Sequence, residues 1–132
     1  MGNKGFWVES AGGDLGPRNF TSGAVHPHVD VVEAAEEVQV HVELAGVQER
    51  DIQLSVHDGV LTVAGEKHPH NRQEWRQDRY LAERSFGAFR RTISLPPGVD
   101  EEGARASFED GLLTVVFPRK EVPVGKSIPI NQ

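Results

Sequence analysis

The sequence has 132 residues, of which 37 % are hydrophobic and 26 % charged, with a net charge of −6. This length is typical of one domain, and the acidic excess argues against nucleic-acid binding, which needs clustered lysine and arginine. The absence of cysteine excludes disulfides and thiolate metal sites, and no apolar run approaches the ~20 residues that cross a bilayer, so we expect a cytoplasmic protein without a membrane partner.

Residues 1–24 are rich in Gly, Ser and Asn, and their large apolar side chains follow neither a helical nor a strand period. We therefore expect a short flexible arm. Aromatic side chains on such an arm are candidates for contacts with a partner, although incidental aromatics explain the pattern equally well. The candidate residues are Phe6, Trp7 and Phe20.

A period of two, the pattern of half-buried strands, begins at Val25. Every second residue is apolar in 38–44 and again in 52–56. Asp58-Gly59 then leads into a third apolar run, and Asp-Gly between such runs is a strong signal of a two-residue hairpin turn. The pattern predicts antiparallel strands.

This unit of strands occurs twice. SVHDGVLTV at 55–63 returns as SFEDGLLTV 52 residues later, and Gly46-Val47 returns as Gly98-Val99. Two similar three-stranded units, each with one apolar face, predict an all-β, immunoglobulin-like antiparallel sandwich over 25–118. A chance similarity between two hairpins is the alternative.

The polar segment 65–87 between the units is too long for an ordinary hairpin loop. Trp75, Tyr80 and Leu81 give it some apolar content, so we expect a strand that pairs outside its own sheet. A mobile surface loop is the alternative.

Arg91 shares its strand parity with Phe89, Ile93 and Leu95, so its side chain is predicted to face the core. A buried guanidinium is costly unless carboxylates or carbonyls pair with it. We therefore expect acidic partners, either in the domain or across a subunit boundary. A bulge that turns Arg91 outward is the alternative.

Residues 119–132 form an extension in which Pro123 and Pro129 oppose both helix and sheet. Ile128 and Ile130 lie two residues apart, so they point the same way from an extended backbone and can fill two adjacent pockets on a neighbouring surface. An apolar tail without a role is the alternative.

No motif for catalysis or for a cofactor is found. The sequence lacks a G-x-S-x-G elbow and a phosphate-binding glycine loop. Two histidine pairs, His26 with His28 and His68 with His70, have no third ligand at a known metal-site spacing. We expect neither enzyme activity, nor a metal, nor another cofactor.

These features resemble the small heat-shock protein family, whose members share the alpha-crystallin domain. The resemblance rests on A-x-F-x-D-G-L-L-T-V at 106–115, on the stretch 74–100, and on 128–130, which is similar to the family's I-x-I anchor. It implies an ATP-independent holdase of the bacterial or plant type that binds partly unfolded proteins under stress. A CS-domain-type co-chaperone or another protein-binding β-sandwich is the alternative.

The resemblance also implies where the working residues lie. A strand at 75–83 would be exchanged onto the partner's edge strand at 26–32, giving a homodimer, and the tail would dock between strands 52–57 and 104–109. Arg91 corresponds to the family's structurally critical arginine. Because family members usually carry a longer apolar arm than 1–24, we expect a dimer or small oligomer.

The residues so implied are the tail anchor Ile128, Pro129 and Ile130; the groove and client-binding residues Ile52, Leu54, Val56, Ala106 and Phe108; and the dimer-interface residues Trp75, Tyr80, Leu81, Arg91, His28 and Val29.

Overall fold

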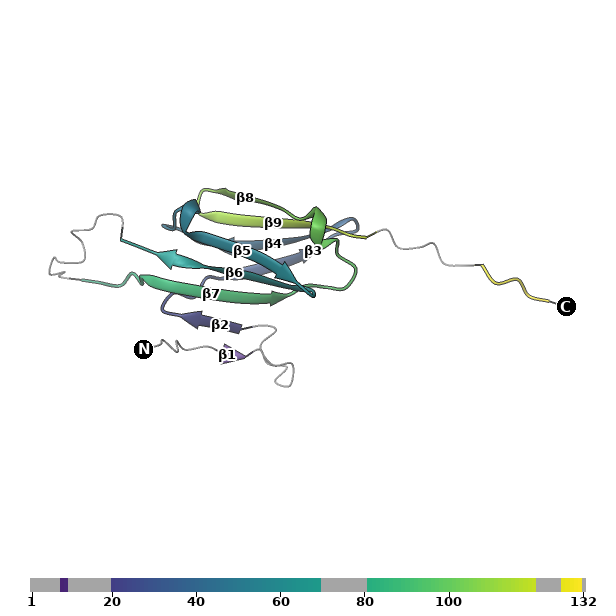
Figure 1. Cartoon of the computed structure of the whole chain (residues 1–132), viewed down its shortest axis with the longest axis horizontal. Helices are drawn as coiled ribbons and strands as arrows, with labels where there is room; N and C mark the ends of the chain where they lie inside the picture. Colours follow the sequence, from purple (N-terminus) through teal and green to yellow (C-terminus); the bar gives the residue numbers. More distant parts are fainter. Residues whose placement is uncertain (1–7, 10–19, 70–80, 121–126, 132) are drawn as a thin grey trace.

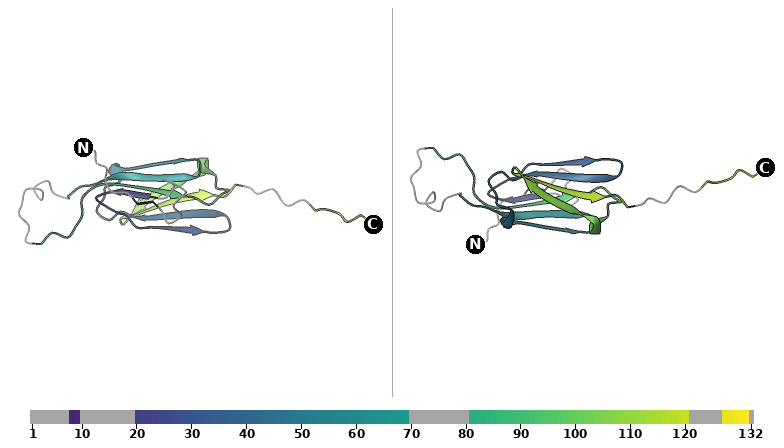
Figure 2. Two further views of the ribbon diagram at one scale, coloured as in Figure 1. Left: turned by 90° about the horizontal axis from the view of Figure 1, so that it is seen from below. Right: turned by 90° about the horizontal axis from the view of Figure 1, so that it is seen from above.

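In the computed structural model, two antiparallel sheets face each other as a sandwich (Figure 1, Figure 2). The structure describes residues 8–9, 20–69, 81–120 and 127–131. The all-β antiparallel sandwich predicted from the alternating pattern is confirmed.

The strands divide between the two sheets in a mixed chain order. The larger sheet is ordered β1 (Val8–Glu9), β2 (Phe20–Gly23), β7 (Gly87–Ser94), β6 (Val60–Lys67) and β5 (Ile52–His57). The smaller sheet is ordered β3 (Val29–Glu33), β4 (Glu37–Glu43), β9 (Leu112–Pro118) and β8 (Arg105–Glu109). The 3-10 helices η2 (Glu49–Asp51) and η4 (Glu101–Gly103) precede β5 and β8. Among the described residues, no helix has the length and apolar character to cross a membrane.

The core lies between the sheets and follows the period of two. Val38, Val40 and Val42 of β4 are fully buried, and the residues between them are only half-buried. Leu61 and Phe117 fill the space opposite and beside them, within one cluster of buried apolar side chains. Burial of these inward faces is the main force that holds the sheets together.

Both predicted Asp-Gly hairpins are present. Asp58 and Asp110 have φ angles of 50° and 53°, and Gly59 and Gly111 have 76° and 77°. Positive φ at both central residues defines the type I′ turn, whose twist matches that of the flanking strands. The matching angles show that the sequence repeat is also a structural repeat.

We predicted that each repeated unit forms one sheet of the sandwich. The structure differs, because each sheet contains strands from both units. The first strand of each unit pairs with the hairpin of the other, because β4 pairs with β9 and β7 pairs with β6. Reciprocal hydrogen bonds fasten this exchange: the Leu44 N–H donates to the Gly111 carbonyl at 2.7 Å, and the Leu95 N–H donates to the Gly59 carbonyl at 2.8 Å. The halves are therefore interlocked, since each sheet needs strands from both.

The predicted N-terminal arm also contributes to the sandwich. Phe20 lies in β2, which pairs with β7, so the expectation that residues 1–24 contain no strand was wrong there. Gly23 permits the close approach, because a Cβ at that position would overlap the carbonyl oxygen of Ala88. Pairing satisfies backbone groups along the β7 edge that would otherwise be exposed. Phe6 and Trp7 lie outside the described residues.

Candidate functional site

The strands β5 and β8 are edge strands of the two sheets on the same side of the sandwich (Figure 1). A groove lies between them. It contains a cavity of about 260 Å³. The residues lining this cavity are Glu49, Ile52, Leu54, Ala106, Ser107, Phe108 and Leu113.

The walls of the groove are apolar because inward-facing residues of edge strands lack a neighbour on one side. Leu54 is inward-facing by the alternation of β5, yet it is 38 % exposed. Ile52 and Phe108 are half-buried and pack against the core cluster, while Ala106 is too small to fill the space. An apolar surface of this kind is a common feature of sites that bind other polypeptides.

The structure brings four of the five predicted groove residues together around the cavity: Ile52, Leu54, Ala106 and Phe108. Val56 does not line it, because Val56 is half-buried against the core near the other end of β5. Sequence reasoning missed Glu49, Ser107 and Leu113. The position of Glu49 just before β5 and the inward parity of Leu113 in β9 were the available signals.

One end of the groove is closed by a carboxylate. Oε2 of Glu101, in η4, accepts a hydrogen bond of 2.6 Å from the N–H of Gly59, in the turn between β5 and β6. Because the acceptor is ionised, this bond is stronger than one between neutral groups. It ties η4 to the hairpin at the end where Val56 lies.

The other end of the groove is open. Glu49, in η2, is the repeat equivalent of Glu101, 52 residues earlier. In the described part of the chain, the Glu49 side chain has no hydrogen-bond or ion-pair partner. It is also the one charged side chain among the described residues that line the cavity. The groove therefore has a closed end at η4 and an open, acidic end at η2.

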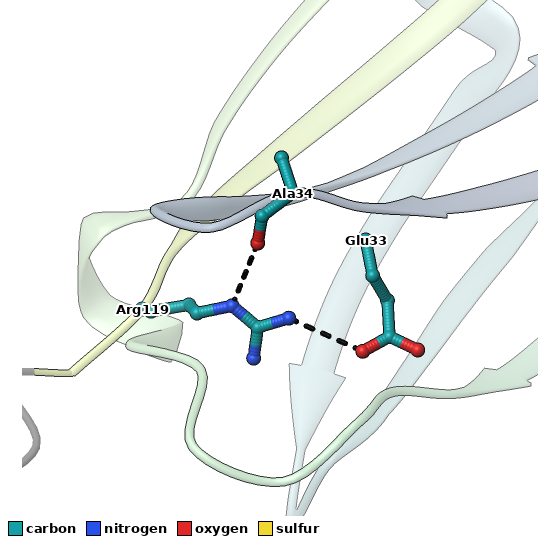
Figure 3. A network of polar contacts seen from close by, with 3 residues as sticks. All are labelled: Glu33, Ala34 and Arg119. Carbon is teal, nitrogen blue, oxygen red and sulfur yellow. Dashed lines mark hydrogen bonds and ion pairs between the residues drawn. The ribbon is translucent and has the colours of Figure 1, made fainter.

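The C-terminal extension begins at the closed end, where Arg119 fastens it to the turn after β3 (Figure 3). Nε of Arg119 donates to the Ala34 carbonyl at 2.9 Å, and Nη2 donates to Oε1 of Glu33 at 3.1 Å. Beyond this root, the side chains of Ile128 and Ile130 are 82 % and 87 % exposed, and Pro129 is exposed as well. The tail anchor is thus not packed in the groove of its own chain.

The residues expected at a dimer interface lie partly outside the described structure. Trp75 and Tyr80 are not described, and Leu81 is exposed outside any strand. The expected acceptor, 26–32, overlaps β3, the edge strand of the smaller sheet opposite β8. His28 precedes β3 and Val29 begins it. The exposed side chains of Val31 and Val32 add apolar surface to this edge.

Arg91 is half-buried, and its hydrogen-bond partner within the described part of the chain is a backbone carbonyl. Nη1 donates to the Pro27 carbonyl at 2.6 Å, and Nε is buried without a hydrogen-bond partner among the described residues. Desolvation lowers the pKa of Arg91 below its usual value. The described residues also contain no group of three or more His, Asp or Glu side chains that could hold a metal ion.

Comparison with known proteins agrees with this architecture of two antiparallel sheets. Residues 30–131 match the model of the Hsp20/alpha crystallin family. The chain belongs to this family. It is 35 % identical over 115 residues to small heat shock protein C4 of Rickettsia felis, an alignment that covers 87 % of this chain and 70 % of that protein.

Solved structures agree with the sequence relatives. Heat shock protein 16.0 from Schizosaccharomyces pombe superposes with a TM-score of 0.69 at 37 % identity, covering 83 % of this chain and 78 % of that one. A small heat-shock protein from Xylella fastidiosa, described as having a distinct high order structure, gives a TM-score of 0.69 at 26 % identity and covers 83 % and 100 %.

Family membership confirms the resemblance predicted from sequence and favours it over the CS-domain alternative. The family consists of non-enzymatic chaperones, which confirms the prediction that the chain is not an enzyme. The family also implies client binding and oligomerisation. Two relatives are named as chloroplastic and mitochondrial proteins, so the family as a whole is not confined to one compartment.

Proposed function

We propose that the protein is an ATP-independent holdase, which binds partly unfolded proteins under stress and keeps them from aggregating. The observation that carries the proposal is the open apolar groove between β5 and β8, with Leu54 exposed beside Ala106. Two edge strands offer backbone hydrogen-bonding groups next to apolar pockets, and this combination fits an extended, unfolded segment without a particular sequence.

The same groove receives the tail anchor of another copy. Ile128 and Ile130 are exposed and share a face when the chain is extended, so they match a groove walled by Ile52 and Phe108. At ~25 cal/mol per Å² of apolar surface, burying two isoleucine side chains contributes at most a few kcal/mol. The anchor therefore exchanges readily, and the groove is free for clients when the tail leaves.

We infer that the chain forms a homodimer by strand exchange. The segment 75–83 of one copy would pair with β3 of its partner, burying Val31 and Val32 and covering the open edge of the smaller sheet. The half-buried Arg91 would find its acidic partner across this boundary. Dimers would associate through the C-terminal anchor into small oligomers.

We propose that Phe6, Trp7 and Phe20 make additional contacts with client proteins. The cysteine-free, acidic sequence supports a cytoplasmic protein without nucleic-acid, membrane or cofactor partners.

The decisive experiment is a heat-aggregation assay of a heat-labile client protein, with and without this protein and in the absence of ATP. We expect lower turbidity in proportion to the amount of protein added. Replacing Leu54 with Ser in the groove should weaken protection, whereas the Gln53→Ser control, on the outward face of β5, should not. Unchanged turbidity at several-fold molar excess would contradict the holdase proposal.

The anchor is tested separately by removing residues 126–132. Light scattering should then show a shift toward dimers. A large, shell-like assembly of the intact chain would contradict the proposal of a small oligomer.

A further inference from the structure

The groove has a direction because equivalent carboxylates at its two ends are used differently. At the closed end, Glu101 accepts a hydrogen bond from the N–H of Gly59. Glu49 lines the cavity at the open end and has no partner among the described residues. Figure 1 shows η2 at the end of the sandwich near the turn between β8 and β9, and η4 at the opposite end. An extended occupant therefore meets a negative charge at one end of the apolar cavity only.

The C-terminal tail carries a charge that matches this arrangement. Lys126, Ile128 and Ile130 are spaced two residues apart, so in an extended chain all three side chains lie on one face. The groove presents a comparable order along β5, with Glu49 first and then Ile52 and Leu54. The cation of the tail would thus face the carboxylate of Glu49, and its two isoleucines would face the apolar walls that follow.

We propose that Glu49 orients the docked tail of a second copy by pairing with Lys126, so that the tail enters at η2 and runs toward η4, parallel to β5. This inference rests on the proposed docking of the tail anchor and adds its direction and its charge requirement. The carboxylate of Glu49 also makes the groove selective, because an apolar segment preceded by a cation binds better than the same segment preceded by an acid.

The occupant must come from another copy because the tail begins at the wrong end of its own groove. Arg119 is fastened at the closed end, next to η4. Seven residues lead from Arg119 to Lys126, which is at most about 24 Å of extended chain. A strand as long as β5 already spans about 20 Å, so too few residues remain to reach η2 and reverse direction.

Binding of a fluorescent peptide with the sequence of residues 119–132 tests the inference. The protein is the full chain carrying Ile128→Ala and Ile130→Ala, so that its own tail does not compete. Fluorescence anisotropy compares the wild-type peptide with a Lys126→Glu peptide, each on protein with Glu49 and with Glu49→Lys.

We expect Glu49→Lys to weaken binding of the wild-type peptide by about fivefold, which is the upper range for an exposed ion pair. The Lys126→Glu peptide should bind the Glu49→Lys protein better than it binds the Glu49 protein. High salt should reduce both differences, because it screens exposed charges. Glu102→Lys makes the same charge change on η4 and is the matched control. It should leave the affinity for the wild-type peptide unchanged.

The outcomes separate this inference from the proposed function. Tight binding that ignores the charges at positions 49 and 126 overturns the inference and leaves tail docking in place. Rescue of the Lys126→Glu peptide by Glu102→Lys instead of Glu49→Lys overturns the proposed direction. No binding of the wild-type peptide, or equal binding of a peptide with both isoleucines replaced by alanine, overturns tail docking and the inference together.

Discussion

The two ends of the groove are built from the same sequence unit, yet one is closed and the other open. At the closed end, Glu101 binds Gly59, Val56 packs on the core, and Arg119 anchors the extension. At the open end, Glu49 stands beside a cavity walled by Ile52 and other apolar residues. The same sequence unit thus forms a hydrogen bond across the sandwich in one copy and lines an open cavity in the other.

Edge strands therefore need not be protected along their whole length. A fully open groove between β5 and β8 would be a hazard for aggregation, and a fully closed one could bind nothing. Closing the η4 end fixes the spacing of the two sheets. At the η2 end, the groove keeps an apolar cavity of about 260 Å³ beside Glu49.

The largest expected difference concerns the equivalent leucines Leu61 and Leu113, both buried. Leu61→Ala should lower the free energy of unfolding by about 3 kcal/mol, because it leaves an enclosed cavity. Leu113→Ala should cost about 2 kcal/mol, because Leu113 borders the open groove and its site relaxes more easily. Urea unfolding at one protein concentration measures both. Equal losses would contradict an open end, and Leu112→Ala, outward on β9, is the control.

The hairpin glycines give the next largest difference. Both have positive φ, so Gly59→Ala should cost about 1 kcal/mol from backbone strain alone. Gly111→Ala should cost about 2 kcal/mol, because a Cβ there would also lie 3.0 Å from Cα of Ala45, whereas Gly59 faces open space. Thermal unfolding compares the two variants. A larger loss for Gly59→Ala would show that crowding does not distinguish the turns.

The carboxylates at the two ends are compared directly by alanine substitution. Glu101→Ala should destabilise the fold by about 1.5 kcal/mol, because the N–H of Gly59 loses a charged acceptor. Glu49→Ala should change stability by less than about 0.5 kcal/mol, since it removes no hydrogen bond among the described residues. Chemical denaturation checks both values. A similar cost for the two variants would mean that Glu49 is also structural.

The smallest effect is expected at the root of the extension. Glu33→Gln removes an exposed ion pair with Arg119 and should cost about 0.3 kcal/mol, a difference that high salt abolishes. Arg119→Ala should cost about 1 kcal/mol, because it also removes the bond to the Ala34 carbonyl. Denaturation at low and high salt separates the two contributions. If Glu33→Gln lowered the free energy of unfolding as much as Arg119→Ala does, the ion pair and not the bond to the Ala34 carbonyl would account for the whole effect.

Much of the fold could be read from local patterns. The alternation in β4 and β5 indicates which side chains face inward, and Asp58-Gly59 and Asp110-Gly111 specify the turns through their backbone preferences. The repeat, the family resemblance and the shared face of Ile128 and Ile130 are also properties of neighbouring residues.

How these pieces combine depends on contacts between residues that are distant in sequence. Local patterns name a strand's inward face and leave its partners open, so the exchange of β4 and β7 between the halves and the addition of β2 to β7 came from non-local hydrogen bonds. The placement of Val56 outside the cavity and of Glu49 at its rim depends on which carboxylate reaches the opposing turn. That choice is a matter of packing across the sandwich, where residues distant in sequence meet.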